Sequence, residues 1–93
     1  MKHVVIWVFG RVQGVFFRVN TKKQADKLGI SGWVRNRLNG AVQISASGTE
    51  PQLRSFISWC SSGSPLSKVT DIKVEWSESE GELNTGFVIT QTV

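Results

Sequence analysis

The chain has 93 residues, of which 40% are hydrophobic and 19% charged, and its formal net charge is +4. This length fits one hydrophobic core, so we expect a single domain over residues 1–93. The hydrophobic fraction excludes an intrinsically disordered chain. The longest apolar run, residues 4–9, is too short for a membrane-spanning helix, which needs about 18 apolar residues, or for a signal-peptide core.

The chain has one cysteine, Cys60, and one histidine, His3. A single cysteine excludes an internal disulfide, and the two residues are too few for a four-ligand zinc site. We therefore expect a protein of the reducing cytoplasm, with no metal and no cofactor. His3 precedes the first predicted strand at a terminus expected to fray, which is a poor position for a Ser-His-Asp or Cys-His site. Cys60 lies on the apolar stripe of a predicted helix and is expected to be an inert packing group.

The charges are unevenly distributed along the chain. Residues 1–49 contain eight Lys and Arg against one Asp, for a net charge of +7, whereas residues 50–93 carry −3. A concentration of positive charge attracts anions, so the first half could meet nucleic acid or a small phosphate compound. Solvated surface charge explains the same numbers, and composition does not decide between the two.

The first half predicts a strand, a helix and a hairpin. Residues 4–9 form a β-branched and aromatic run, typical of a strand that is central in its sheet and buried on both faces. Residues 20–28 predict a helix that stops at Gly29. The segments 33–38 and 41–47 flank Asn39-Gly40, which predicts a type I′ turn with positive φ at both residues.

The second half predicts a well-defined helix and two strands. Thr49 and Gln52 match a capping box, Pro51 lies in the first turn, and apolar residues follow at 53, 56, 57 and 60. Residues 61–67 predict a loop and residues 69–76 a half-buried strand. An acidic, turn-rich segment over 77–85 then leads to a short strand over 86–90.

The element order predicts the fold class α/β (α+β), a ferredoxin-like βαββαβ sandwich with a short extra C-terminal strand. Two helices would cover one face of a mostly antiparallel sheet. This fold carries many unrelated functions, so it does not identify the chemistry.

The segment GRVQGVFFR, residues 10–18, lies between the first strand and the first helix. Its two glycines let the backbone turn closely, and successive backbone N–H groups from Gln13, Gly14, Val15, Phe16 and Phe17 would form a nest for an anion. The side chains of residues 15–17 are expected to pack and hold the loop rigid. Arg18 would lie at the rim and offer paired donors to phosphate oxygens. An ordinary loop would show the same glycine spacing.

Other phosphate chemistry fits the sequence less well. A nucleotide-binding P-loop needs Gly-Lys-Ser/Thr after its glycines, and this chain has Gly14-Val15-Phe16. Cysteine phosphatases need an Arg shortly after the nucleophile, and no Arg follows Arg54.

The segment GRVQGVFFR, followed by GWVRNRLNGAVQISASG over residues 32–48, resembles the two signature stretches of the acylphosphatases. The resemblance implies hydrolysis of the carboxyl–phosphate anhydride of small acyl phosphates to carboxylate and orthophosphate, without metal, cofactor or phosphoenzyme. By the same resemblance Arg18 binds the phosphate, and Asn36 orients the attacking water. Considered without the motif, a lone asparagine in a strand more often has a structural role, and the place of Asn36 inside the second motif is what favours the role in catalysis.

The chain departs from the family pattern at Asn39, where an acidic residue is more usual, and at its end, which lacks the frequent aromatic. The expected partners are a small acyl phosphate and orthophosphate, with no nucleic acid and no membrane, and the expected state is a monomer. The alternatives are a ferredoxin-like binding module for RNA and a phosphate or acyl-phosphate sensor without catalysis. Against RNA, the aromatic RNP1 pattern is absent.

Overall fold

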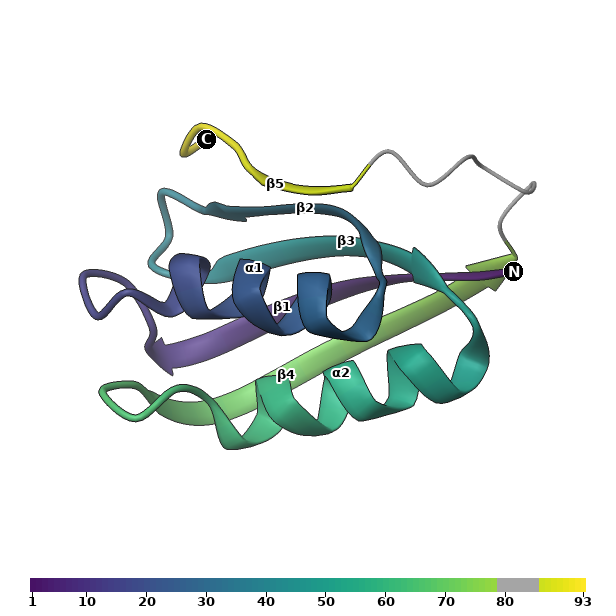
Figure 1. Ribbon diagram of the computed structural model, residues 1–93. Coiled ribbons are helices and arrows are strands. Elements are labelled where there is room, and N and C mark those ends of the chain that lie inside the picture. The colour runs from purple at the N-terminus through teal and green to yellow at the C-terminus, as the bar shows by residue number, and fades with distance from the viewer. Residues whose placement is uncertain (79–85) are drawn as a thin grey trace.

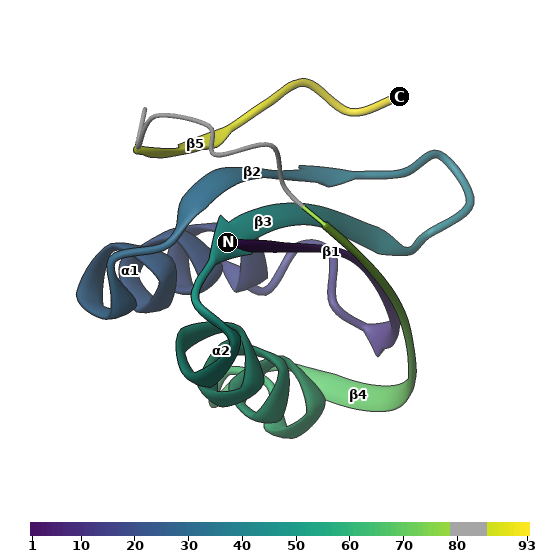
Figure 2. The same cartoon turned by 90° about the vertical axis from the view of Figure 1, so that its right-hand side faces the viewer.

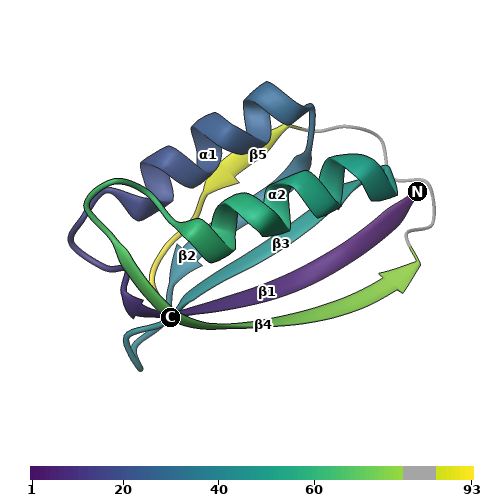
Figure 3. The same ribbon diagram turned by 90° about the horizontal axis from the view of Figure 1, so that it is seen from below.

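The computed structural model describes residues 1–78 and 86–93, so most of the turn predicted over 77–85 lies outside the described residues. The described elements form one five-stranded sheet with two helices on one of its faces (Figures 1 and 3). In chain order they are β1 (Lys2–Arg11), α1 (Phe17–Leu28), β2 (Ser31–Asn36), β3 (Val42–Gly48), α2 (Glu50–Ser62), β4 (Lys68–Glu78) and β5 (Phe87–Ile89). The predicted ferredoxin-like fold class is therefore confirmed. No helix in the described ranges is long and apolar enough to cross a membrane.

The strands lie in the order β4-β1-β3-β2-β5. β1 is thus an interior strand with a neighbour on each side, although the middle strand of the sheet is β3. β1 pairs antiparallel with β3 and β4, and β2 pairs antiparallel with β3. Only β5 runs parallel to its neighbour β2, as Figure 2 shows for the C-terminal segment alongside that strand. The mixed sheet thus places the end of the chain next to residues from its first half.

The core lies between the sheet and the helices. Alternate residues of β1, namely Val4, Ile6 and Val8, are fully buried there. The prediction that β1 is buried on both faces is wrong, because both helices cover the same face. Trp7 points to the open face, where the Lys73 ammonium lies 5.3 Å from its ring centroid. Because the side chains on the open face are also apolar, the sequence of β1 does not alternate between apolar and polar residues as a half-exposed strand usually does.

The helix α2 forms as predicted. The Thr49 hydroxyl accepts from the Gln52 backbone N–H, and the Gln52 side chain accepts from the Thr49 N–H. The side-chain amide of Gln52 also donates to the carbonyl oxygen of Leu28 at the end of α1, at 2.9 Å. The cap of α2 therefore fixes the position of α1 as well.

The sequence predicted that the helix α1 begins at Asn20, but in the structure it begins at Phe17. The first backbone bond of the helix runs from the Asn20 N–H to the Phe16 carbonyl oxygen, at 3.1 Å. Aromatic and β-branched residues in this first turn have modest helix propensity, which hid the start of the helix. Phe17 is buried in the core, and its burial offsets the weak propensity.

The turn after β2 also differs from the prediction. Gly40 has a φ of 94°, but Asn39 does not have positive φ, so the turn is not type I′. The Gly40 N–H donates to the Arg37 carbonyl, and the Arg37 N–H donates to the Ala41 carbonyl. This pattern is a three-residue hairpin loop in which the glycine follows the turn, and Asn39 Oδ1 accepts from the Ala41 N–H. The loop is one residue longer than the predicted two.

Candidate functional site

The loop between β1 and α1 presents a row of backbone donors. Gly14 has a φ of 73° and Phe16 a φ of 61°, and these two left-handed residues turn the chain from the strand into the helix. The backbone N–H groups of residues 13–18 have no protein acceptor within the part of the chain that the structure describes. Donors at a helix start, reinforced by the helix dipole, favour an anion. The free donors and the curved backbone are compatible with an anion nest, and the role of these residues stays a prediction.

The three apolar side chains of this loop behave differently from one another. Phe17 packs against Trp59 with 5.5 Å between ring centroids, and Val15 packs against the core. Phe16, which the sequence predicted as a packing group, is instead 69% exposed. Its left-handed backbone turns the side chain away from the core.

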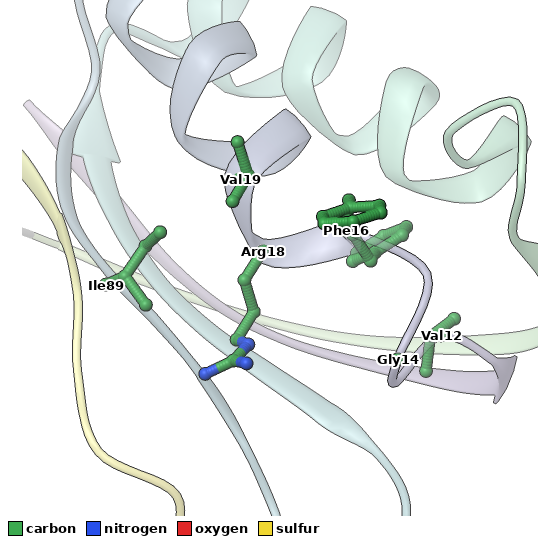
Figure 4. Close-up of a pocket in the computed structure, with 7 residues that line it drawn as sticks. Val12, Gly14, Phe16, Arg18, Val19 and Ile89 are labelled. Carbon is green, nitrogen blue, oxygen red and sulfur yellow. The ribbon is translucent and has the colours of Figure 1, made fainter.

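Arg18 lies in the first turn of α1, next to these donors. Its side chain is half-buried, and it has no acidic partner and no hydrogen-bond acceptor among residues 1–78 and 86–93. Figure 4 shows the guanidinium extending from the helix between Ile89 of β5 and the loop at Gly14. Most protein guanidinium groups find an acceptor, so this position favours an external anion.

Arg18 and the loop share one cavity with a volume of about 280 Å³. Its lining residues come from the loop, the first turn of α1 and β5: Val12, Gly14, Phe16, Phe17, Arg18, Val19 and Ile89. Only one of these side chains is charged. Val12, Val19 and Ile89 were not predicted as site residues from the sequence. The parallel pairing of β5 with β2 is what brings Ile89 to this position.

Gln13 anchors the loop to the turn after β2. Its side-chain Nε2 donates to the carbonyl oxygen of Arg37 at 2.7 Å and to that of Ala41 at 2.9 Å. The side chain of Gln13 is thus occupied within the protein, and only its backbone N–H remains for a substrate. The anchor places the loop beside the chain that directly follows Asn36, and both lie at the same end of the molecule (Figure 1).

Asn36 is the last residue of β2 and is 9% exposed. It lies on the helix side of the sheet, in alternation with buried Val34, although it does not line the cavity of Arg18. Its Oδ1 is buried and has no hydrogen-bond donor among the described residues. Its backbone carbonyl accepts from the Val93 N–H at 3.2 Å. The side-chain oxygen is therefore a free acceptor on a firmly held strand.

The histidine and the cysteine lie away from this cavity. His3 is part of β1 rather than of a frayed terminus, and its ring nitrogens lie 2.8 Å from Ser47 Oγ and 3.1 Å from Ser45 Oγ. These contacts are at the opposite end of β1 from the loop. Cys60 is fully buried in α2, and burial raises the pKa of its thiol. In the described ranges no three His, Cys, Asp or Glu side chains form a group that could hold a metal.

Comparisons with known proteins agree on one family. The sequence model of the acylphosphatase family matches residues 4–89. An acylphosphatase of Pelotomaculum thermopropionicum is 42% identical over 87 residues, which are 94% of this chain and 91% of that protein. An acylphosphatase of Bacillus licheniformis is 54% identical over 70 residues, 75% of this chain and 78% of that protein. The crystal structure of the acylphosphatase from Bacillus subtilis superposes with a TM-score of 0.90 at 48% identity, covering 97% of this chain and 99% of that one. None of these relatives favours the RNA-binding alternative.

Proposed function

The chain belongs to the acylphosphatase family, and from this premise we propose that residues 13–17 and Arg18 bind the phosphoryl group while Asn36 orients the attacking water. The reaction is hydrolysis of the carboxyl–phosphate anhydride of a small acyl phosphate to a carboxylate and orthophosphate. The observation that supports the proposal most directly is the unpaired guanidinium of Arg18 beside the free backbone donors of the loop.

In the proposed mechanism the phosphoryl group is held by the backbone donors of the loop and by the positive charge of Arg18. A phosphoryl dianion presents three equatorial oxygens, and its transition state is stabilised mainly by fixed donors and positive charge. The backbone N–H groups of residues 13–17 can donate to these oxygens without reorganising, since Gly14 and Phe16 hold the loop in its curved conformation. Arg18 adds paired donors and a full positive charge from the first turn of α1.

The leaving group needs no proton donor. A carboxylate leaves as the base of an acid with a pKa near ~4, so it is expelled unprotonated at neutral pH. Among the residues that the structure describes, no histidine or carboxylate lines the cavity, and none is required for this step. The proposed mechanism therefore uses no general acid, no metal, no cofactor and no phosphoenzyme.

Asn36 supplies an acceptor for the nucleophile. A buried carbonyl oxygen without a donor costs about 1–3 kcal/mol, and a water molecule that donates to Oδ1 removes this cost. A water held in this way keeps a lone pair free to attack phosphorus. The Gln13 anchor joins the phosphate loop to residue 37, next to Asn36, and so fixes the loop relative to the water.

The partners and compartment complete the proposal. The substrate is a small acyl phosphate and one product is orthophosphate, and we propose that the enzyme acts as a monomer in the cytoplasm without nucleic acid. The single cysteine, buried and unpaired, is compatible with a reducing compartment. Size-exclusion chromatography with light scattering would test the monomer directly.

The deciding experiment measures phosphate release from benzoyl phosphate by the purified protein and by two Arg18 variants. Arg18→Ala should abolish measurable hydrolysis and weaken competitive inhibition by orthophosphate. Arg18→Lys should restore little, because an ammonium cannot donate in the same paired geometry. If Arg18→Ala retained its circular dichroism spectrum and near-normal kcat/KM, the phosphate anchor would lie elsewhere.

A chelator tests the absence of a metal. Activity should persist after dialysis against EDTA, since the proposed site uses only backbone donors, Arg18 and Asn36. Loss of most activity under EDTA, with recovery on addition of Mg²⁺ or Zn²⁺, would contradict the mechanism.

A further inference from the structure

We propose that the open face of the sheet carries a second anion site, formed by Arg35, Arg37 and Gln43, which binds the phosphate group of a small molecule. The site lies on the opposite face of the sheet from the cavity of Arg18, because Arg35 alternates along β2 with two buried residues, Val34 and Asn36, that face the helices. The inference goes beyond the proposed function, which makes no use of these three side chains.

The two arginine side chains meet at one neutral oxygen atom. Gln43 Oε1 accepts from Nε and Nη2 of Arg35 at 3.2 and 3.1 Å, and from Nη1 of Arg37 at 3.3 Å. The strand register explains this meeting, because Arg35 lies directly opposite Gln43 on the paired strands β2 and β3. Two hydrated side chains of like charge would turn away from each other. Here one oxygen holds both guanidinium groups, so two positive charges are close neighbours with no negative charge between them.

The arginine pair has no carboxylate partner within the described part of the chain. Neither Arg35 nor Arg37 takes part in an ion pair there, and the end of the chain at Val93 forms none with them. Four other cations in the same ranges each pair with an acidic side chain: Lys2, Lys22, Arg54 and Lys73. The acidic residues of the open face, Asp71 and Glu75, belong to β4, and the strands β1 and β3 lie between β4 and β2. Neighbouring strands are about 4.8 Å apart, so roughly 14 Å separates those acids from β2.

Arg35 is held in place before any ligand binds. Its guanidinium lies 4.4 Å from the ring centroid of Trp33 and makes two hydrogen bonds with Gln43. Because these contacts fix the side chain, an anion would bind without first ordering it, which lowers the entropic cost of binding. Both helices lie on the other side of the sheet, as Figure 2 shows, and Arg35 and Arg37 are only half-buried. The site is therefore open to a ligand from solvent.

The N–H donors that remain free determine the class of ligand. Each guanidinium has five N–H groups, and among residues 1–78 and 86–93 those of Arg35 and Arg37 have no acceptor besides Gln43. A carboxylate has one charge and two oxygens, and a single arginine satisfies it. A phosphate monoester has three free oxygens and nearly two negative charges at neutral pH. It can accept from both guanidinium groups at once and neutralise both charges, so the site fits orthophosphate or an organic phosphate monoester.

The test follows the site by NMR in the ¹⁵N-labelled protein, titrated at constant ionic strength with orthophosphate and, separately, with phenyl phosphate. The signals observed are the Nε–H of Arg35 and the side-chain amide of Gln43, because both groups lie at the site. Both signals should shift in a saturable way, whereas sodium chloride at the same ionic strength should not shift them. Equal affinity for the two compounds would identify the free ion as a sufficient ligand, and tighter binding of phenyl phosphate would identify an organic monoester.

Gln43→Glu is the decisive variant. It keeps the size of the side chain but places a carboxylate between the two guanidinium groups, which satisfies them within the protein. The affinity for phosphate at Arg35 should fall at least about 10-fold. The melting temperature at low salt should rise, so the loss of binding would not come from unfolding. Arg37→Gln removes one of the two charges and should also weaken binding about 10-fold.

Arg54→Gln provides the matched control. It removes the same charge as Arg37→Gln, but Arg54 lies on α2, on the other side of the sheet, and pairs with Glu50 at 2.9 Å. This variant should leave the titration of Arg35 unchanged. A loss of affinity equal to that in Arg37→Gln would mean that the net charge of the protein attracts the phosphate, and the open-face site would be overturned.

The same titrations separate this inference from the proposed function. Arg18→Ala removes the proposed catalytic anchor and should leave the titration of Arg35 unchanged. If it abolishes the shifts of Arg35, phosphate bound at the cavity causes them and the open-face site is overturned. The site is also overturned if the signals of Arg35 and Gln43 do not saturate, or if Gln43→Glu binds phosphate as tightly as the wild type. If the signals saturate as expected but the wild type hydrolyses no benzoyl phosphate, the proposed function fails and the open-face site stands.

Discussion

The side-chain amide of Gln13 donates a 2.7 Å hydrogen bond to the carbonyl oxygen of Arg37 and thereby joins the loop after β1 to the turn after β2. The two residues are 24 positions apart, and the same amide also reaches the carbonyl of Ala41. Through this anchor the residues proposed to bind phosphate and the residue proposed to orient water belong to one rigid unit. The anchor should therefore affect the rate more than it affects stability.

Gln13→Leu should lower kcat by about 10-fold or more, because a small displacement of the loop misaligns phosphate and water. Its cost in stability should be only about 1 kcal/mol, since both carbonyl oxygens keep a backbone donor, from Gly40 and Arg37 respectively. Gln13→Glu should be worse than Gln13→Leu, because a carboxylate would face two carbonyl oxygens. Urea denaturation and steady-state kinetics on benzoyl phosphate measure the two effects. A large loss of stability with normal kcat in the folded fraction would reduce Gln13 to a structural residue.

Asn36→Ala should lower kcat about 100-fold, equivalent to about 2.7 kcal/mol, while the Ki for orthophosphate changes only a few-fold. Orienting a nucleophile stabilises the transition state and not the ground-state complex. Stability should change little, because Oδ1 makes no hydrogen bond with the described residues. Asn36→Asp should lower both kcat and phosphate affinity, since its carboxylate would repel the phosphoryl dianion. A loss confined to phosphate affinity in Asn36→Ala would remove the residue from the water-orienting role.

Deletion of Thr92 and Val93 should lower kcat, because it removes backbone hydrogen bonds that hold Asn36 and the end of β2 in position. The Val93 N–H donates to the Asn36 carbonyl, and the Val93 carbonyl accepts from the Leu38 N–H at 2.9 Å. Without these two bonds the end of β2 is held on one side only, by β3. We expect a fall of several-fold in kcat with a smaller change in KM, measured on benzoyl phosphate. A point variant, Val93→Ala, keeps the backbone bonds and serves as the control; equal losses in both would assign the effect to the side chain.

Cys60 predicts a specific dependence of stability on pH. Burial raises the pKa of its thiol in the folded state. In the unfolded chain the pKa of the thiol is about 8.5. The neutral buried thiol therefore makes its full contribution to the free energy of unfolding below about pH 8.5. This contribution is lost as the pH rises further, because the thiol then ionises in the unfolded chain and not in the folded one. The destabilisation caused by Cys60→Ala, about 1 kcal/mol or more at pH 7, should shrink by about 1.4 kcal/mol per pH unit above pH 8.5.

Urea denaturation of wild type and Cys60→Ala at pH 7 and pH 9.5 measures this difference. The hydrolytic activity of Cys60→Ala at pH 7 should match that of the wild type, since the thiol does not line the cavity. A difference in unfolding free energy that is the same at both pH values would show that the thiol is accessible to water in the folded protein.

The amino-acid sequence by itself determined the elements whose signals are local. The capping box of α2 needs only residues three apart, and the run over residues 4–9 needs only its own β-branched side chains to favour a strand. The two glycines of the loop and the adjacent Arg18 are also within a single short segment, so the sequence could suggest an anion-binding loop there. The glycine spacing alone also fits an ordinary loop, and the resemblance to the acylphosphatases is what favoured the phosphate site. Such features can be predicted from the sequence because they depend on interactions between residues that are close in the chain.

Only the tertiary structure decided which distant residues complete the site. Ile89 enters the cavity because β5 pairs in parallel with β2, and Val93 holds Asn36 for the same reason. The exposure of Phe16 depends on a left-handed backbone angle that no propensity predicts for a phenylalanine. The packing of all strands and helices together decides which residues approach one another across the sheet. The interactions that fix these positions form between distant segments, so no single segment contains them.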